Sequence, residues 1–199
     1  MNQMKTKIEL PVLIIIRGIP GSGKTFLANK LAASIGTIKC VNLDPDATDY
    51  DSEEYKQHVN QQTKDGVDAK LHAYRFLRAK AYKAIAENKI IIWNQPFTDL
   101  DIMKKVTERL TEQAKLEGTN LPIIVLEVTV PKEIAWQRIQ DRIKHGGHGP
   151  TENKFAQFFD QYKSATSYNY NCITINGLED NDDLIQKIMD QANSAAKGF

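Results

Sequence analysis

The feature that most constrains this chain is the segment GIPGSGKT at residues 18–25, which matches the pattern G-x-x-x-x-G-K-[ST] at every fixed position. The apolar run Val12–Ile16 precedes it and an amphipathic stretch from Lys24 follows it, which is the order strand, glycine-rich turn, helix. Glycines in such a turn let successive backbone N–H groups point inward, where they and the helix N-terminus attract an anion. The sequence therefore predicts a phosphate-binding loop at the end of a buried strand.

A loop of this kind predicts a nucleoside triphosphate and Mg²⁺ as ligands. Lys24 is expected to reach the β- and γ-phosphates, and the Thr25 hydroxyl is expected to bind Mg²⁺. The predicted nucleotide-binding residues are Gly18, Pro20, Gly21, Ser22, Gly23, Lys24, Thr25 and Phe26.

The composition indicates one globular domain, residues 1–199, because 41% hydrophobic and 26% charged residues are near the average for such proteins. The longest apolar run is too short to cross a membrane, and residues 1–10 lack the apolar core of an export signal. We therefore expect a cytoplasmic protein that does not bind membranes. A net charge of +1 argues against nucleic acid as a general electrostatic partner.

Strand-like and helix-like segments alternate along the chain, a pattern typical of a mostly parallel sheet covered by helices on both faces. The expected strands lie at 12–17, 38–43, 89–93, 123–130 and 172–176. The expected helices lie at 24–34, 68–88, 98–117, after Pro131, at 151–165 and at 182–195, with one short helix in the polar excursion 47–68. The predicted fold class is α/β, a three-layer P-loop NTPase fold with a five-stranded, mainly parallel sheet. On the helix over 68–88, the predicted buried stripe is Leu71, Tyr74, Leu77, Ala81 and Ile85.

Two aspartates, Asp44 and Asp46, follow the second expected strand. Because the carboxyl ends of parallel strands gather on one side of a sheet, this pair is expected to face the bound nucleotide. Phosphoryl transfer to a hydroxyl needs a carboxylate that orients the nucleophile and takes its proton. We predict Asp46 as this base, and Asp44 as a residue that holds Mg²⁺ through water or positions Asp46. A capped turn with solvated carboxylates is the alternative interpretation.

Two arginines, Arg138 and Arg142, are the predicted catalytic cations, since a spacing of four places them on one face of a helix. The glycine-rich loop at 145–150 would let the end of that helix close over the nucleotide as a lid, at about 138–155, and exclude water. A solvated charge stripe with Asp141 and Lys144 is the alternative interpretation of these arginines.

Three patches together resemble the zeta-toxin-like branch of P-loop kinases, which is grouped with small AAA-type ATPases: GIPGSGKT, NLDPD at 42–46, and R-x-x-x-R-x-x-HGGH at 138–148. The resemblance implies that Asp46 is the catalytic base and that Arg138 and Arg142 are lid arginines that assist transfer. Well-studied members phosphorylate a hydroxyl of a UDP-linked amino sugar, and related small kinases modify other metabolites or antibiotics. The chain departs from the toxins in having WNQPF at 93–97, where they have an acidic residue, and Lys154 near the place of a further lid arginine.

The sequence thus predicts an ATP-dependent kinase that phosphorylates a hydroxyl of a small molecule. A guanine-specific GTPase is disfavoured, because the nearest match to Asn-Lys-x-Asp is NKLA at 29–32, within the first helix. Two alternatives stay open. One is an ATP-binding regulatory module that hydrolyses ATP slowly, and the other is a nucleic-acid-end kinase with a basic cleft around Arg75, Arg78 and Lys80. The sequence indicates no particular protein partner.

Overall fold

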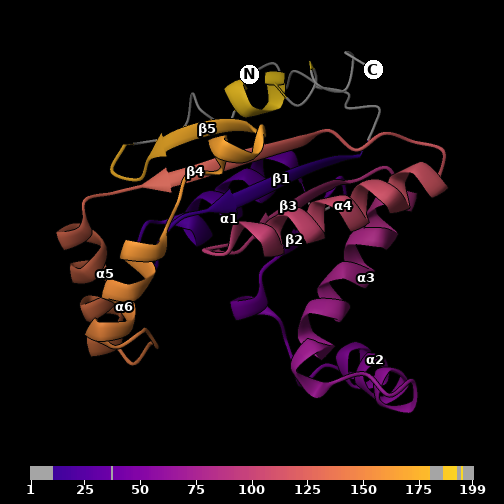
Figure 1. The fold of residues 1–199 in the computed structure, drawn as a ribbon, viewed down its shortest axis with the longest axis horizontal. Helices are drawn as coiled ribbons and strands as arrows, with labels where there is room; N and C mark the ends of the chain where they lie inside the picture. Colours follow the sequence, from indigo (N-terminus) through magenta and orange to yellow (C-terminus); the bar gives the residue numbers. More distant parts are fainter. Residues whose placement is uncertain (1–10, 37, 180–185, 192–193, 195–199) are drawn as a thin grey trace.

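The structure is a computed structural model that describes residues 11–36, 38–179, 186–191 and 194. Its centre is a five-stranded sheet with the order β2-β3-β1-β4-β5 (Figure 1). The strands are β1 (Val12–Arg17), β2 (Cys40–Leu43), β3 (Ile90–Asn94), β4 (Ile123–Thr129) and β5 (Asn171–Asn176). Each pairing between these strands is parallel, so their carboxyl ends meet at one edge. The predicted α/β architecture is confirmed.

The central strand β1 divides the protein interior into two apolar layers. All six of its residues are buried, as expected for a parallel strand covered on both faces. Since successive side chains point to opposite faces, Leu13 and Ile15 pack toward helices α3 (His72–Ala86) and α4 (Leu100–Leu116). Val12, Ile14 and Ile16 pack on the other face, toward α1 (Lys24–Ile35). This burial fixes the strand that ends at the phosphate loop.

One arm projects from the sheet on the side of β2 and consists of α2 (Glu53–Lys64) and the first turns of α3 (Figure 1). The predicted short helix of the polar excursion is α2, which contacts α3 through the rings of Tyr55 and Phe76, with centroids 5.1 Å apart. The prediction of a buried stripe is wrong at its start, because Leu71 and Tyr74 are 46% and 50% exposed. Leu71 directly precedes α3 and Tyr74 lies in its first turn, in the part of the arm that projects from the sheet (Figure 1).

A second arm is formed by α5 (Lys132–Lys144) and α6 (Glu152–Gln161), which lie side by side beyond the end of β4 (Figure 1). Phe155 is buried between them and stacks on Trp136, with ring centroids 5.2 Å apart. The predicted lid, at about 138–155, lies within this helical hairpin, hereafter the lid hairpin, which has its own small apolar centre. Helix α6 ends earlier than predicted, and the predicted helix at 182–195 lies partly outside the described residues. No helix among the described residues is long and apolar enough to span a membrane.

Candidate active site

The phosphate loop packs closely against both β4 and the lid. A Cβ on Gly21, where φ is +81°, would lie 2.3 Å from the carbonyl oxygen of Ala135 in α5. A Cβ on Gly18 would lie 2.4 Å from the carbonyl oxygen of Val128. Only glycine permits these approaches, because 2.3 Å is far inside van der Waals contact. The loop and the lid helix therefore share a backbone-to-backbone contact.

Lys24 lies at the centre of the charged groups of the loop. Its Nζ donates a hydrogen bond to the carbonyl of Ile19 at 3.0 Å. Burial lowers the pKa of Lys24 to about 8, the charges of Asp44 and Asp46 oppose this change, and the charge of Arg142 adds to it. These residues therefore lie within electrostatic reach of one another.

A cavity of about 480 Å³ opens beside the loop, between the two arms. The predicted site residues that line it are Pro20, Lys24, Thr25, Asp44, Asp46 and Arg142. Asp44 is 8% exposed, whereas Asp46 is exposed at the cavity surface. The structure thus brings together, in one cavity, the lysine of the loop, both aspartates and one lid arginine.

A smaller cavity of about 220 Å³ adjoins the phosphate loop. It shares Lys24, Thr25 and Arg142 with the larger cavity, and its other lining residues include Gly21, Gly23, Phe26 and Arg138. Phe26 is 69% exposed. Nucleotide phosphates on the loop would thus lie where the two cavities meet.

Among the described residues, the partners of the Arg138 guanidinium are backbone carbonyls. One guanidinium nitrogen lies 3.4 Å from the carbonyl oxygens of both Gly21 and Ser22, and the other donates to Gly177 at 3.1 Å. Arg138 therefore links the lid helix to the phosphate loop and to the turn after β5. Ser22 is buried below it, and its hydroxyl has no hydrogen-bond partner among the described residues.

A chain of hydrogen bonds joins the ends of β2 and β3 to the loop. The side-chain amide of Asn94 donates to Asp44 Oδ2 at 2.6 Å and to Thr25 Oγ1 at 3.0 Å. The backbone N–H of Asp46 donates to Asp44 Oδ1 at 2.8 Å. A carboxylate in place of Asn94 would repel Asp44, so a neutral donor suits this position.

The residues present fit Mg²⁺. Asn94 is 3% exposed, and its Nδ2 contacts the oxygens of Thr25 and Asp44. Its Oδ1 is a buried acceptor without a partner among the described residues. Oxygen atoms of hydroxyl, carboxylate and amide groups, often reached through water, are what Mg²⁺ prefers. Thr25 and Asp44 are the predicted metal residues, and Asn94, a neutral amide at the end of β3, adds a further oxygen.

Further residues line the larger cavity besides the predicted catalytic, nucleotide-binding and metal residues. They are Tyr74, residues 95–99, Ile102, residues 148–150, Lys154 and Phe158. Helical periodicity predicts Tyr74 in the core, and only its polar hydroxyl and its place near the start of the helix point elsewhere. Lys154 lies at the cavity, near the place where the toxins carry a further arginine.

The structure does not gather the three basic residues expected for a nucleic-acid-end kinase around the larger cavity. Lys80 pairs with Glu54 at 3.0 Å, and its Nζ lies 4.5 Å from the centroid of the Phe76 ring. Arg75 and Arg78 are not among the described residues that line the larger cavity.

The pKa of Lys24 gives a pH dependence that can be measured. We expect the affinity for ATP to fall above about pH 8, by up to about tenfold per pH unit, because neutral lysine does not attract phosphate. Between about pH 8 and the ordinary lysine value the folded protein binds fewer protons than the unfolded chain, so the free energy of unfolding rises with pH there. Titration with a fluorescent ATP analogue and Mg²⁺ checks the binding; Lys24→Arg stays charged and should lack the inflection.

The comparisons with known proteins define the class of this protein. Residues 13–165 match the family model described as AAA domain, so the chain belongs to the AAA domain family. A comparison with curated proteins gives no match.

Solved structures share the fold over nearly the whole chain. A candidate kinase from Chloroflexus aurantiacus matches with a TM-score of 0.62 and 17% identity, over 95% of this chain and 100% of its own. A gluconokinase from Sinorhizobium meliloti matches with a TM-score of 0.55 and 12% identity, over 96% of this chain and 97% of its own. Deoxyadenosine kinase from M. mycoides matches with a TM-score of 0.51 and 17% identity, over 90% of this chain and 98% of its own. The fold is therefore that of small P-loop kinases.

Proposed function

We propose that this protein is an ATP- and Mg²⁺-dependent kinase that transfers the γ-phosphate of ATP to a hydroxyl group of a small molecule. The observation that carries the proposal is the cavity in which Lys24, Asp46 and Arg142 line the same space. A cation from the phosphate loop, a carboxylate and a cation from the lid are the groups that phosphoryl transfer requires. Gluconokinase and deoxyadenosine kinase, whose fold this chain shares, support the proposal.

In the proposed reaction, the acceptor hydroxyl oxygen attacks the γ-phosphorus, and the bond between that phosphorus and the bridging oxygen of ADP breaks. Asp46 orients the hydroxyl and takes its proton. Lys24 and Arg142 stabilise the negative charge of the transferred group, and Arg138 holds the loop to the lid. Thr25, Asp44 and Asn94 would hold Mg²⁺, which when bound neutralises the β- and γ-phosphate oxygens.

We place the chain in the zeta-toxin-like branch of these kinases as a finer part of the proposal. The three sequence patches support this, and the cavity position of Lys154 is compatible with it. A UDP-linked amino sugar is therefore the first single acceptor to test.

The test is transfer of the labelled γ-phosphate from ATP, with Mg²⁺, to a pool of metabolites and separately to a UDP-linked amino sugar. We expect label in a small molecule, and loss of that label in Lys24→Ala by about a thousandfold because one main charge contact to the phosphates is gone. Label only in free phosphate would contradict the kinase and favour the slow regulatory ATPase, the alternative that Asn94 in place of an acidic residue supports. A third reaction with a short oligonucleotide as the acceptor tests the nucleic-acid-end kinase, which label on the oligonucleotide end would favour.

A further inference from the structure

The residue immediately before the phosphate loop is a fully buried arginine. Arg17 is 0% exposed, and its partner Glu127, which is 4% exposed, lies opposite it in the pairing of β1 with β4. Removing two charges from water is costly, and replacing such a pair by apolar residues of similar volume is often neutral or stabilising. Stability alone therefore does not account for this pair, and its geometry points to a further role.

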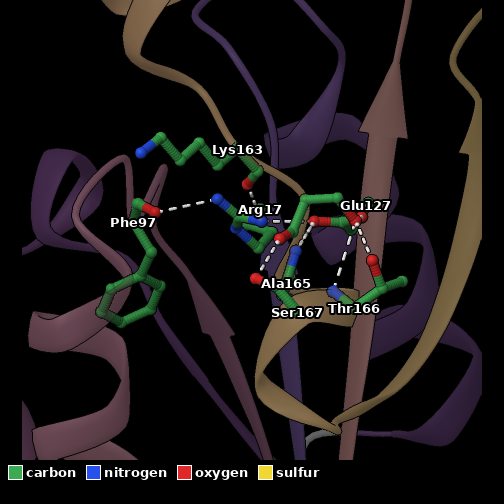
Figure 2. Close-up of polar contacts among 8 residues, drawn as sticks. Arg17, Phe97, Glu127, Lys163, Ala165, Thr166 and Ser167 are labelled. Carbon is green, nitrogen blue, oxygen red and sulfur yellow. Dashed lines mark hydrogen bonds and ion pairs between the residues drawn. The ribbon is translucent and has the colours of Figure 1, made fainter.

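Arg17 also donates to two backbone carbonyls from separate segments through its terminal nitrogens. It donates to Phe97 at 2.9 Å and to Lys163 at 2.8 Å, while its guanidinium carbon lies 4.3 Å from the centroid of the Tyr162 ring. Figure 2 shows the arginine between Phe97 on one side and Glu127 on the other. The planar guanidinium with its fixed donors suits this arrangement, which a lysine cannot reproduce.

Glu127 holds the same segment after α6 from its other side. Its carboxylate accepts a hydrogen bond from the backbone N–H of Ala165 at 2.8 Å (Figure 2). It accepts another from the hydroxyl of Ser164 at 2.6 Å. Residues 163–165 are where the lid hairpin rejoins the body of the protein. The ion pair therefore fixes the root of the lid.

Phe97 belongs to the opposite wall of the larger cavity. Its φ of +45° is uncommon for a residue with a side chain, and such a conformation persists only where the surroundings hold it. The hydrogen bond from Arg17 to its carbonyl is one such restraint. This hydrogen bond therefore helps to fix the backbone of residues 95–99, which line the larger cavity.

We propose that Arg17 and Glu127 are positioning residues. They hold the cavity wall at residues 95–99 and the lid root at residues 163–165 in fixed places relative to the end of β1, which carries the phosphate loop. The inference rests on the proposed kinase function. Its consequence is selective. Acceptor binding in the larger cavity depends on the pair, because residues 95–99 line that cavity and the lid root holds α6, whose Lys154 and Phe158 line it too. ATP binding does not depend on it, because the loop itself is held by Arg138 and by the packing of Gly18 and Gly21.

The kinetic test compares Arg17→Lys, which keeps the charge, with the double variant Arg17→Met and Glu127→Met, which removes both charges and keeps the volume. We expect the KM for the acceptor to rise by roughly ten- to a hundredfold in both, with the affinity for ATP changed by less than about twofold. Leu110→Ala, a core change in α4 away from the cavity, controls for lost stability. Equal loss of ATP and acceptor binding, or no loss in a folded variant, overturns the proposal.

Hydrogen exchange gives a second readout that needs no transfer reaction. In Arg17→Lys we expect backbone amides of residues 97–99 and 164–166 to exchange at least about tenfold faster, with residues 18–25 unchanged. Faster exchange of these two segments without any labelled product would leave the positioning pair standing and reject the kinase function. Uniform acceleration across the protein, as expected in Leu110→Ala, would mean that the pair only stabilises the fold.

Discussion

Replacement of Asp46 by Asn is expected to lower phosphoryl transfer by about a hundred- to ten-thousandfold while ATP binding stays unchanged. The amide keeps the size of the side chain and loses the ability to take the proton of the acceptor hydroxyl. Asp46 is exposed at the cavity, and its carboxylate accepts no hydrogen bond from the described residues that would give it a structural role. Single-turnover transfer of labelled phosphate, with ATP affinity measured in parallel, checks the expectation.

Asp65→Asn is the matched control, because Asp65 is an exposed aspartate at the end of α2 that does not line the cavity. It should transfer phosphate at the rate of the unchanged protein. Transfer by Asp46→Asn within about threefold of that rate would remove Asp46 from its proposed role. A slow hydrolysis of ATP that is indifferent to Asp46 would favour the regulatory module.

Gly21→Ala is expected to weaken ATP binding by at least about a hundredfold, or about 2.7 kcal/mol. The new Cβ would lie 2.3 Å from a backbone oxygen of Ala135, which cannot move without shifting α5. The phosphate loop or the lid helix must therefore leave its place. Titration with a fluorescent ATP analogue measures the loss, and thermal unfolding measures its effect on the fold.

Gly36→Ala separates this clash from backbone strain. Gly36 also has a positive φ, +89°, but a Cβ at this position would have no atom of the described residues within 4 Å. Its replacement should cost roughly 1–3 kcal/mol of unfolding free energy, because its ψ of 139° with this φ is rarely adopted by residues with a side chain, and should leave ATP binding unchanged. If both variants bound ATP equally well, the contact between the loop and α5 would not matter for nucleotide binding.

Local sequence patterns were sufficient for the elements whose cause is local. The phosphate loop follows from eight consecutive positions, and the strand before it from an unbroken apolar run. The parallel sheet follows from the alternation of strands and helices, and the structure confirms it. Helical spacing wrongly predicts that Tyr74 is buried, because periodicity identifies one face of a helix and does not reveal where the sheet that covers it ends.

Long-range contacts decide the parts of the site that the sequence did not indicate. Arg17 ends an apolar strand, and no local pattern says that its charge is buried against Glu127 on β4. The sequence does not predict the positive φ of Phe97, since glycine is the residue that usually indicates such a conformation. The predicted roles of Asp44, Asp46, Arg138 and Arg142 remain predictions, although the structure gathers these residues around the phosphate loop.

The order of strands in the sheet also determines how long β1 remains without its partner strands while the chain is being synthesised. Val12 pairs with Ile90 on one side of β1, and Leu13 pairs with Ile123 on the other. At ribosomal speeds β1 is synthesised on the order of ten seconds before β4, the later of its two partner strands. Until then its consecutive apolar residues, several of them β-branched, form a segment that aggregates readily. The strand that carries the phosphate loop therefore depends on being shielded during synthesis, and a chain that stops before β4 lacks the means to bury it.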